Sequence, residues 1–293
     1  MKKKTSNNLL YVILFFIALE AILFYSNNYK INKAITLENT KLIQTQQALA
    51  SVPVEAKAVS VYDVTQKKTL YGKNDDVAMP LASLAKIMTI IAALNTYNPD
   101  DTISISQNAI NQAGDYGLFA NEKWKVGDLA KLTLVVSSND GAYAFSENIP
   151  DFLNKINEKA KKIGAQKALF LNSNGLDLSA SQAGAFATAS DVNQMAVFAY
   201  DDYPYIFGAT ILPEIHLKSV SGFEHTFKNT DTILSDIPDL LFSKTGFTNI
   251  AGGNLCIIFK NKSGHEIAIT ILGSTFDGRF NDMKKLVEVM DNL

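Results

Sequence analysis

The spacing of hydrophobic residues changes several times along the chain, and each change predicts a different element. Residues 58–73 alternate apolar and polar side chains on both sides of a lysine-rich turn, which predicts a β-hairpin. Residues 82–94 are apolar on nearly every side after Ser83, as in a helix that is buried in a domain core. This helix is expected to end near Leu94, because an Asn-Pro pair soon follows.

Helical patterns fill the middle of the chain, and strand patterns fill its last third. The expected helices cover residues 126–149 with an interruption at 137–140, residues 152–165, 188–200 and 281–293, and the expected strands cover residues 238–248, 253–264 and 265–275. Gly164 would close the second of these helices, and Ser190 or Asp191 would cap the third. Strands joined by short turns are antiparallel, and helices inserted between strands from both chain ends indicate an α+β fold.

An apolar run near the N-terminus is set apart from this pattern. Residues 9–25 are apolar except for Glu20, follow several lysines, and end without a small-x-small cleavage site or a lipobox cysteine. These features predict an uncleaved signal anchor with a cytoplasmic N-terminus and the rest of the chain outside the membrane. The predicted order is a cytoplasmic tail (1–8), a single transmembrane helix (9–25), an extracytoplasmic stalk (26–55) and one folded domain (56–293).

The composition excludes several classes of function. The 27 basic and 29 acidic side chains nearly balance, so nucleic acid is not an expected partner. Cys256 is the only cysteine, which excludes a disulfide within the chain. The three histidines show no metal-ligand spacing. We therefore expect neither a metal site nor a cofactor.

One residue contradicts the apolar character of the buried helix. Lys86 lies in its first turn, and a buried ammonium group is unfavourable unless it is paired or deprotonated. A lysine at a helix end can keep its charged group in water while its stem covers apolar surface. Alternatively, Ser83 and Lys86 form an i, i+3 pair on one helix face, where the lysine could take the proton of the serine hydroxyl and make it a nucleophile.

Two further short motifs bear on this choice. A Ser-x-Asn motif at residues 137–139 lies between two expected helices, where it could simply cap the second. A Lys-Thr-Gly motif at residues 244–246 lies in an expected strand, where glycine often marks a bulge or the close approach of a ligand. Together with Ser-x-x-Lys at residues 83–86, and in this order, the motifs match the signature of penicillin-binding proteins and serine β-lactamases.

Each motif also has a chemical task in acyl transfer. Ser83 would attack a carbonyl and Lys86 would take its proton, which requires a lowered pKa of Lys86. Burial, together with the nearby charge of Lys244, would lower that pKa. Ser137 could relay the proton toward the leaving amine, while Asn139 would orient Lys86 and the substrate amide.

The remaining motif residues would bind the substrate. Lys244 and Thr245 would hold a terminal carboxylate, and Gly246 would let the substrate approach the strand closely. The backbone N–H groups of Ser83 and Phe247 would form an oxyanion hole. These positions would therefore place one peptide bond of the substrate against the serine.

A single arginine adds to this set. Arg279 is the only arginine in a lysine-rich chain, so lysine is used wherever a plain positive charge suffices. Arginine is better suited than lysine to hold a carboxylate through two parallel hydrogen bonds. Arg279 is therefore a candidate for binding the substrate carboxylate, with a structural salt bridge as the alternative.

Beyond these motifs, the chain resembles the D-alanyl-D-alanine carboxypeptidases of the low-molecular-mass penicillin-binding proteins. Segments similar to the family, in family order from about Ala58 to the C-terminus, are ASLAKIMT, SSNDGAYAFSENI, KINEKAKKIGA, FLNSNGLD, FATASDV, FSKTGFTNIAGG and ILGSTFDGRF. The resemblance implies a β-lactamase/transpeptidase-like fold, in which helices flank a five-stranded antiparallel sheet. It also implies that Arg279 helps to hold the substrate carboxylate.

The resemblance implies an activity as well. The enzyme would remove the terminal D-alanine from the peptidoglycan stem pentapeptide through an acyl-enzyme at Ser83, and β-lactam antibiotics would inhibit it covalently. It would act outside the bacterial cell membrane, held there by the predicted single-pass anchor. Smaller or polar residues are common in the family in place of Phe247, a difference that bears on substrate preference more than on catalysis.

Three alternatives stay open. A class A β-lactamase needs a glutamate well after the Ser-x-Asn motif to activate the deacylating water, and the nearest candidate, Glu147, follows Asn139 by only eight residues. A catalytically idle wall-binding homologue could keep the same fold. A D,D-endopeptidase would use the same residues and differ only in the peptides that fit.

Overall fold

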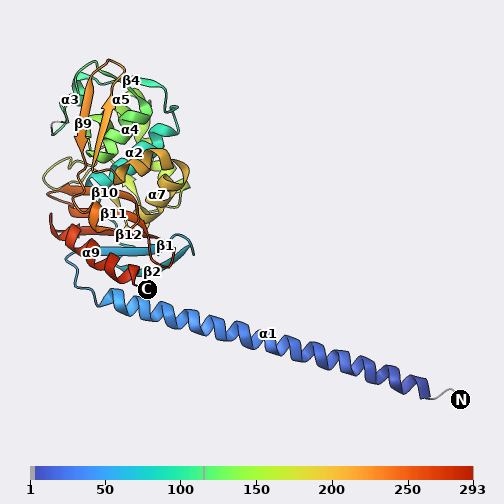
Figure 1. Cartoon of the computed structure of the whole chain (residues 1–293). Coiled ribbons are helices and arrows are strands. Elements are labelled where there is room, and N and C mark those ends of the chain that lie inside the picture. The colour runs from blue at the N-terminus through green and yellow to red at the C-terminus, as the bar shows by residue number, and fades with distance from the viewer. Residues whose placement is uncertain (1–3, 115, 293) are drawn as a thin grey trace. The chain divides into compact units, whose positions relative to one another are not determined.

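The computed structural model describes residues 4–114 and 116–292, which form two units. The first unit consists of most of helix α1 (Lys4–Ala50), and the second begins at Ala48 and contains the remaining elements. Helix α1 is continuous through the predicted anchor and most of the predicted stalk (Figure 1). The bounds expected from the sequence for the folded domain, residues 56–293, stay a prediction.

The structure does not confirm that helix α1 crosses a membrane. Among the described residues, no helix combines the length and the apolar composition that crossing a membrane requires. The apolar stretch of α1 contains Glu20 and is followed by asparagines, lysines and glutamines, so the helix as a whole is of mixed polarity. The prediction of a transmembrane helix over residues 9–25 is therefore not confirmed.

A five-stranded antiparallel sheet organises the second unit. Its strands, in spatial order, are β10 (Leu240–Thr248), β11 (Gly252–Lys260), β12 (Glu266–Ser274), β1 (Ala58–Asp63) and β2 (Lys68–Lys73). The predicted hairpin is β1–β2, and the three predicted C-terminal strands are β10, β11 and β12. Strand β12 pairs with β1 and so joins the two ends of the domain. The α+β prediction is confirmed, and β10 lies at an edge of this sheet.

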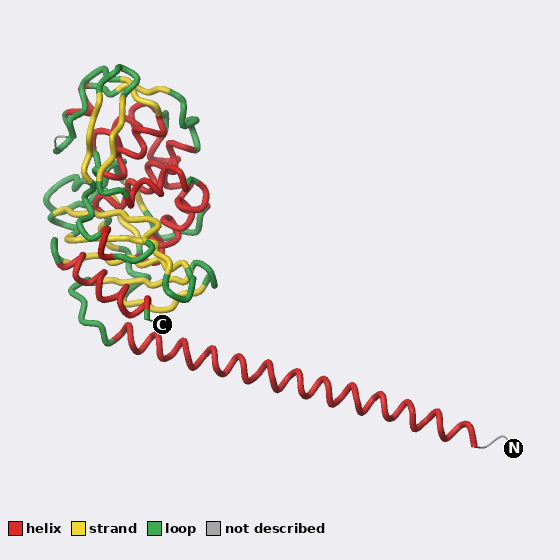
Figure 2. Tube along the Cα trace, viewed as in Figure 1, coloured by secondary structure: helices red, strands yellow, loops and turns green. Residues whose placement is uncertain are grey.

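Most of the helices lie in the sequence between β2 and β10. Figure 2 distinguishes the helices (red) from the strands (yellow). The helical segments of the domain are η1 (Ala82–Ala85), α2 (Lys86–Leu94), α3 (Gln107–Ile110), α4 (Val126–Val135), α5 (Asn139–Asn148), α6 (Phe152–Lys162), α7 (Ala189–Asp202), α8 (Pro204–Phe207), η2 (Gly208–Ile211), η3 (Leu234–Asp236) and α9 (Gly278–Asp291). Helices α7 and α9 pack against the sheet, whereas α2 packs against α4, α5, α6 and α7.

Short strands complete the domain. They are β3 (Met79–Pro80), β6 (Leu169–Phe170) and β7 (Ala185–Ala187), which form one small sheet, and the pairs β4 (Thr102–Ser104) with β5 (Lys123–Lys125) and β8 (Glu214–Lys218) with β9 (Glu224–Lys228). Strands of two to five residues contain too few positions to establish an alternating pattern, so the sequence did not predict them.

The start of α7 differs from the prediction. Thr188 is its N-cap, because the Thr188 hydroxyl accepts a hydrogen bond from the backbone N–H of Asp191 and the Asp191 carboxylate accepts one from the N–H of Thr188. This reciprocal capping box satisfies two backbone donors that the first helical turn leaves without partners. The prediction of Ser190 or Asp191 as the cap was wrong, although Asp191 takes part in the box.

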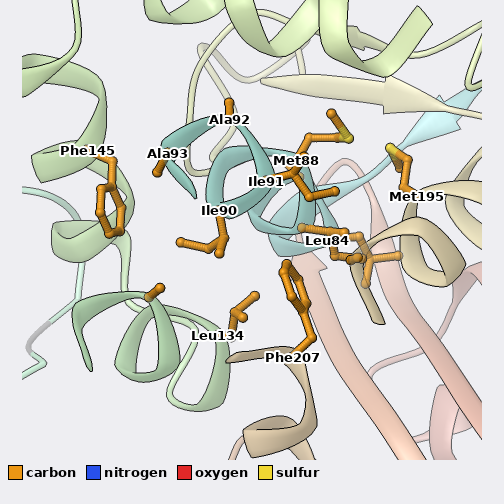
Figure 3. Close-up of a cluster of buried hydrophobic side chains, with 14 of the residues drawn as sticks. Leu84, Met88, Ile90, Ile91, Ala92, Ala93, Leu134, Phe145, Met195 and Phe207 are labelled. Carbon is orange, nitrogen blue, oxygen red and sulfur yellow. The ribbon is translucent and has the colours of Figure 1, made fainter. Parts of the chain in front are cut away.

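Helix α2 lies at the centre of the hydrophobic core. Met88, Ile90 and Ile91 have no exposed surface, and Figure 3 shows them among side chains from neighbouring helices, including Phe145 and Phe207. Burial of each such side chain contributes roughly 1.5–3 kcal/mol. Because close packing surrounds α2 on all sides, the residues at its N-terminus have a fixed position.

Two glycines let separate segments approach the start of α2. A Cβ added to Gly246 in β10 would lie 2.9 Å from the carbonyl oxygen of Leu81 and 3.3 Å from the nitrogen of Ser83. Gly175 has a φ of +79°, and a Cβ there would overlap the carbonyl group of Ala82. Both segments therefore lie against the backbone that carries the serine.

We expect Gly175→Ala to destabilise the domain more than Gly164→Ala. Both glycines have a positive φ, a conformation that costs alanine about 1–2 kcal/mol. A Cβ atom at position 175 would also overlap the backbone of Ala82, whereas a Cβ atom at position 164 would face open space. The overlap should lower the free energy of unfolding by roughly a further 1–3 kcal/mol. Urea denaturation of both variants measures the difference, and equal losses would contradict the close approach.

Candidate active site

Ser83 and Lys86 lie three residues apart at the junction of η1 and α2. The Nζ atom of Lys86 is 2.8 Å from the Oγ atom of Ser83. Lys86 has no exposed surface, so its amine does not reach solvent and the alternative of a snorkelling lysine is excluded. Ala82, just before the serine, has a left-handed φ of 48°, a strained conformation that is frequent at functional sites.

The amine of Lys86 has three oxygen neighbours. Besides the hydroxyl of Ser83, these are the Oδ1 atom of Asn139 at 2.8 Å and the backbone oxygen of Asn174 at 2.7 Å. Asn139 begins α5, and Asn174 lies in the loop that Gly175 allows to approach the start of α2. Three separate segments therefore converge on this nitrogen.

The pKa of Lys86 is well below its usual value. Burial is the largest cause, and the charge of Lys244 lowers the pKa further, whereas Asp140 raises it. A neutral amine keeps two N–H donors and gains a lone pair. The two donors match the two carbonyl oxygens, which leaves the lone pair facing the hydroxyl of Ser83. In the neutral form of the amine, the hydroxyl would donate to this lone pair, as proton transfer to a base requires.

Ser137 and Lys244 form a second pair. The Nζ atom of Lys244 donates to the Oγ atom of Ser137 at 3.0 Å and to the backbone oxygen of Thr245 at 2.9 Å. Ser137 lies between α4 and α5 with a left-handed φ of 62°. Burial lowers the pKa of Lys244 to about 7, and the charge of Arg279 also lowers it, whereas Asp231 raises it.

Asn139 uses both ends of its side-chain amide. Its oxygen accepts from Lys86, as expected from the sequence. Its nitrogen donates to the backbone oxygen of Ala113 at 2.7 Å and to the hydroxyl of Tyr116 at 2.9 Å. The side chain of Asn139 was expected to orient the substrate amide as well, and in the structure its nitrogen is hydrogen-bonded within the protein.

Residues 244–246 bring the edge strand β10 beside Ser83. The close approach at Gly246 places the strand within contact of the serine backbone. The hydroxyl of Thr245 is 2.6 Å from that of Thr230. Phe247 pairs with β11 through its backbone, and its side chain is partly exposed. The predicted substrate-binding residues of this motif therefore lie on the strand that contacts the backbone around Ser83.

Arg279 extends from the first turn of α9 to β10. It is buried, and its Nη1 atom donates to the backbone oxygen of Gly246 at 3.0 Å. The rings of Phe276 and Phe280 lie 4.4 and 4.6 Å from its guanidinium carbon. Within the part of the chain that the structure describes, Arg279 has no ion-pair partner within 4 Å, and its Nε atom has no hydrogen-bond partner. A structural salt bridge is therefore not found there.

Several residues of the site were not predicted. Asn174 contributes a backbone oxygen, which any residue could supply, and Tyr116 lies in a loop without a motif. Asp231 is buried and accepts a hydrogen bond of 2.5 Å from the hydroxyl of Ser243, next to Lys244 in β10. Burial raises the pKa of Asp231. Only the family-like segment FLNSNGLD, which contains Asn174, carried a signal in the sequence.

The site contains three buried basic side chains close together. Lys86, Lys244 and Arg279 are all buried, and the pKa of each is lowered, with burial as the largest cause. The neighbouring acid Asp231 opposes this effect at Lys244 and Arg279. Such a site favours a ligand with a carboxylate next to a carbonyl group that the serine can attack.

Lys244 should make the domain more stable as the pH rises above neutrality. Its pKa is about 7 in the folded protein against 10.5 for an exposed lysine, so between these values the unfolded chain binds a proton that the folded protein does not. The free energy of unfolding then rises by about 1.4 kcal/mol per pH unit. In Lys244→Met this contribution is lost, so urea denaturation at about pH 7.5 and about pH 9 should give a smaller increase.

The control for this measurement is Lys284→Met, which removes an exposed lysine of α9. It should keep the increase of the unmodified protein. Equal increases in the Lys244→Met variant and in the unmodified protein would contradict the lowered pKa of Lys244.

Comparison with known proteins gives consistent matches. The family model described as D-alanyl-D-alanine carboxypeptidase matches residues 43–275. The chain is 27% identical over 230 residues to the D-alanyl-D-alanine carboxypeptidase DacF of Bacillus subtilis, a match that covers 74% of this chain and 57% of the relative. It is 29% identical over 233 residues to a D-alanyl-D-alanine endopeptidase of Pseudomonas aeruginosa, with 72% and 70% covered. The chain thus spans less than two thirds of the Bacillus relative.

A solved structure shares the fold. Penicillin-Binding Protein D2 of Listeria monocytogenes, in its ampicillin-bound form, superimposes with a TM-score of 0.68 at 28% identity. The match covers 82% of this chain and 98% of the Listeria chain. The predicted β-lactamase/transpeptidase-like architecture of the domain is thereby confirmed.

Proposed function

This chain belongs to the D-alanyl-D-alanine carboxypeptidase family, peptidase S11, and we propose that it is a serine-type carboxypeptidase that removes the terminal D-alanine from peptidoglycan stem peptides. The observation that carries the proposal is the contact of 2.8 Å between the hydroxyl of Ser83 and the buried, low-pKa amine of Lys86. An apolar side chain of similar size would stabilise the core better than a buried lysine does. A role as the catalytic base explains why lysine occupies this position.

The proposed acylation step uses the residues around Ser83. Its Oγ atom attacks the carbonyl carbon of the penultimate D-alanine while its proton passes to Lys86. The N–H groups of Ser83 and Phe247 stabilise the oxyanion. The peptide C–N bond then breaks, and the proton held by Lys86 is relayed through Ser137 to the nitrogen of the departing D-alanine, which leaves Lys86 neutral and Ser137 protonated. In the second step Lys86 takes a proton from water, which attacks the ester carbonyl, and passes that proton to the Oγ atom of Ser83 as the ester bond breaks.

The terminal carboxylate of the substrate binds at the buried cations. Lys244 and the hydroxyl of Thr245 lie on β10, and Arg279 approaches the same strand from α9. Because no described carboxylate pairs with Arg279, an anionic substrate would supply the missing negative charge. β-Lactam antibiotics also carry a carboxylate beside a reactive carbonyl, which supports covalent inhibition at Ser83.

Cleavage of peptide cross-links is a second candidate activity. The Pseudomonas relative is named an endopeptidase, and the same catalytic residues would serve both reactions. A class A β-lactamase has less support. Glu147 is exposed in the last turn of α5, on the order of 12 Å along the helix from Asn139, too far to activate water at the acylated serine.

Penicillin should form a long-lived covalent adduct with the full chain, detected as an increase in intact mass. Ser83→Ala should form none, and its release of D-alanine from a peptide ending in D-Ala-D-Ala should fall by at least about 10³-fold. Ser190→Ala, a control in α7 far along the chain from all three motifs, should keep both activities. Drug hydrolysis without an adduct would favour a β-lactamase, and neither reaction would favour an idle wall-binding homologue.

We infer further that α1 anchors the enzyme to the bacterial cell membrane, with the N-terminus in the cytoplasm and the catalytic domain outside. Large apolar side chains are exposed on α1 between Leu9 and Phe16 and again between Leu23 and Tyr25. An apolar surface of this extent is unfavourable in water and is typical of a membrane or partner contact. The lysines that precede the stretch support the proposed orientation.

A charge placed in the apolar stretch should release the enzyme from membranes. The double substitution Leu14→Lys and Phe15→Lys should move most of the protein to the soluble fraction of lysed cells, because each charge opposes burial in lipid by about 2.5–3.5 kcal/mol. Leu37→Lys, on an exposed part of α1 outside the stretch, should stay in the membrane fraction. Recovery of the unmodified chain in the soluble fraction would contradict the anchor.

A further inference from the structure

A cavity of about 430 Å³ lies beside the loop of Asn174, whose backbone oxygen contacts the amine of Lys86. Its walls include Gln112, Tyr143 of α5, Leu153 of α6, Asn174, Leu176 and Asp177. Asn174 connects the cavity to the catalytic base, because its backbone oxygen accepts from Lys86 while its side chain donates to Gln112 at 3.1 Å. The loop that holds the amine of Lys86 is therefore also a wall of the cavity.

Among the described residues that line this cavity, Asp177 is the only charged one. One carboxylate oxygen accepts from the hydroxyl of Thr248 at 2.9 Å, and the other accepts from the N–H of Ile250 at 3.3 Å. No lysine, arginine or histidine of the described chain lies within 4 Å of it. Its two neutral partners fix the carboxylate in place but leave its negative charge without a counter-ion.

The sign of the charge changes along β10. Lys244, with Arg279 nearby, provides positive charge at the start of the catalytic motif, and Thr248 at the end of the strand holds Asp177. Thr248 lies four residues after Lys244 along the strand, which corresponds to a distance of about 13 Å. An edge strand can bind an extended peptide as an additional strand, so a substrate along β10 would meet both charges.

We propose that the cavity binds the ammonium-bearing side chain of the residue that precedes the two D-alanines of the stem peptide. The inference rests on the proposed function and adds a specificity-determining subsite to it. In an extended peptide, the Cα atoms of this residue and of the terminal D-alanine are about 7 Å apart, and a four-carbon side chain adds roughly 6 Å. The ammonium and the terminal carboxylate can therefore reach Asp177 and Lys244 together.

The lining of the cavity fits an alkyl chain that ends in a cation. Leu153 and Leu176 provide apolar walls for the methylene groups. The amide of Gln112 is already hydrogen-bonded at both ends, to Asn174 and to Asn108, so it is not a ready partner for a neutral polar group. The half-buried carboxylate of Asp177 is the charged group of the described lining, and it selects for positive charge.

Two peptides that differ only in the ammonium group test the subsite. They are acetyl-L-lysyl-D-alanyl-D-alanine and the same peptide with norleucine in place of lysine, hydrolysed by the full chain. The readout is the ratio of their kcat/KM values, which should be about ten in the unmodified enzyme and about one in Asp177→Asn. Glu147→Gln, which removes an exposed carboxylate outside the cavity, should keep the ratio of the unmodified enzyme.

Binding measurements keep the test independent of catalysis. Calorimetry with Ser83→Ala should give a Kd for the lysine peptide about tenfold lower than for the norleucine peptide, and the added Asp177→Asn substitution should abolish this difference. A ratio near one before Asp177 is changed, or a ratio that Asp177→Asn leaves unaltered, would overturn the subsite. If neither peptide is hydrolysed and no penicillin adduct forms, the proposed function fails, and the two Kd values alone decide about the subsite.

Discussion

The structure of the site depends on the burial of one amine. Lys86 emerges from the most apolar helix of the domain, and this surrounding disfavours its charged form more than any neighbouring group does. The packing of α2 fixes where the amine lies, and the start of α5 at Asn139 and the loop at Asn174 supply the oxygens that orient it. An open or more polar environment would raise the pKa of the amine and favour its protonated form, which cannot act as a base.

The second constraint is the contact between β10 and the turn that carries Ser83. Sheet, helix and loop come from distant parts of the sequence, and they meet because Gly246 and Gly175 lack side chains. The small volume of these residues is thus as necessary to the site as the reactive groups are. The same contact places the charges of Lys244 and Arg279 at the strand edge, where an extended substrate can reach them.

Local patterns predicted the parts of this arrangement that are encoded locally. The β1–β2 hairpin, the buried helix α2 and the lowered pKa of Lys86 all follow from residue spacing and burial. Tyr116 and Asp231 could not be predicted, because their roles depend on loops that reach the site only in the folded chain. The cap of α7 was misplaced because serine, threonine and aspartate all suit that position, and only the geometry selects Thr188.

The occupied amide of Asn139 has a consequence for affinity. Its nitrogen already donates to Ala113 and Tyr116, so a substrate carbonyl that binds there must replace an existing hydrogen bond. The exchange conserves the number of bonds and contributes little net free energy of binding. For the proposed substrate, a hydrogen bond between its backbone carbonyl and Asn139 would therefore set the orientation of the peptide. The strength of binding would come from its charged groups.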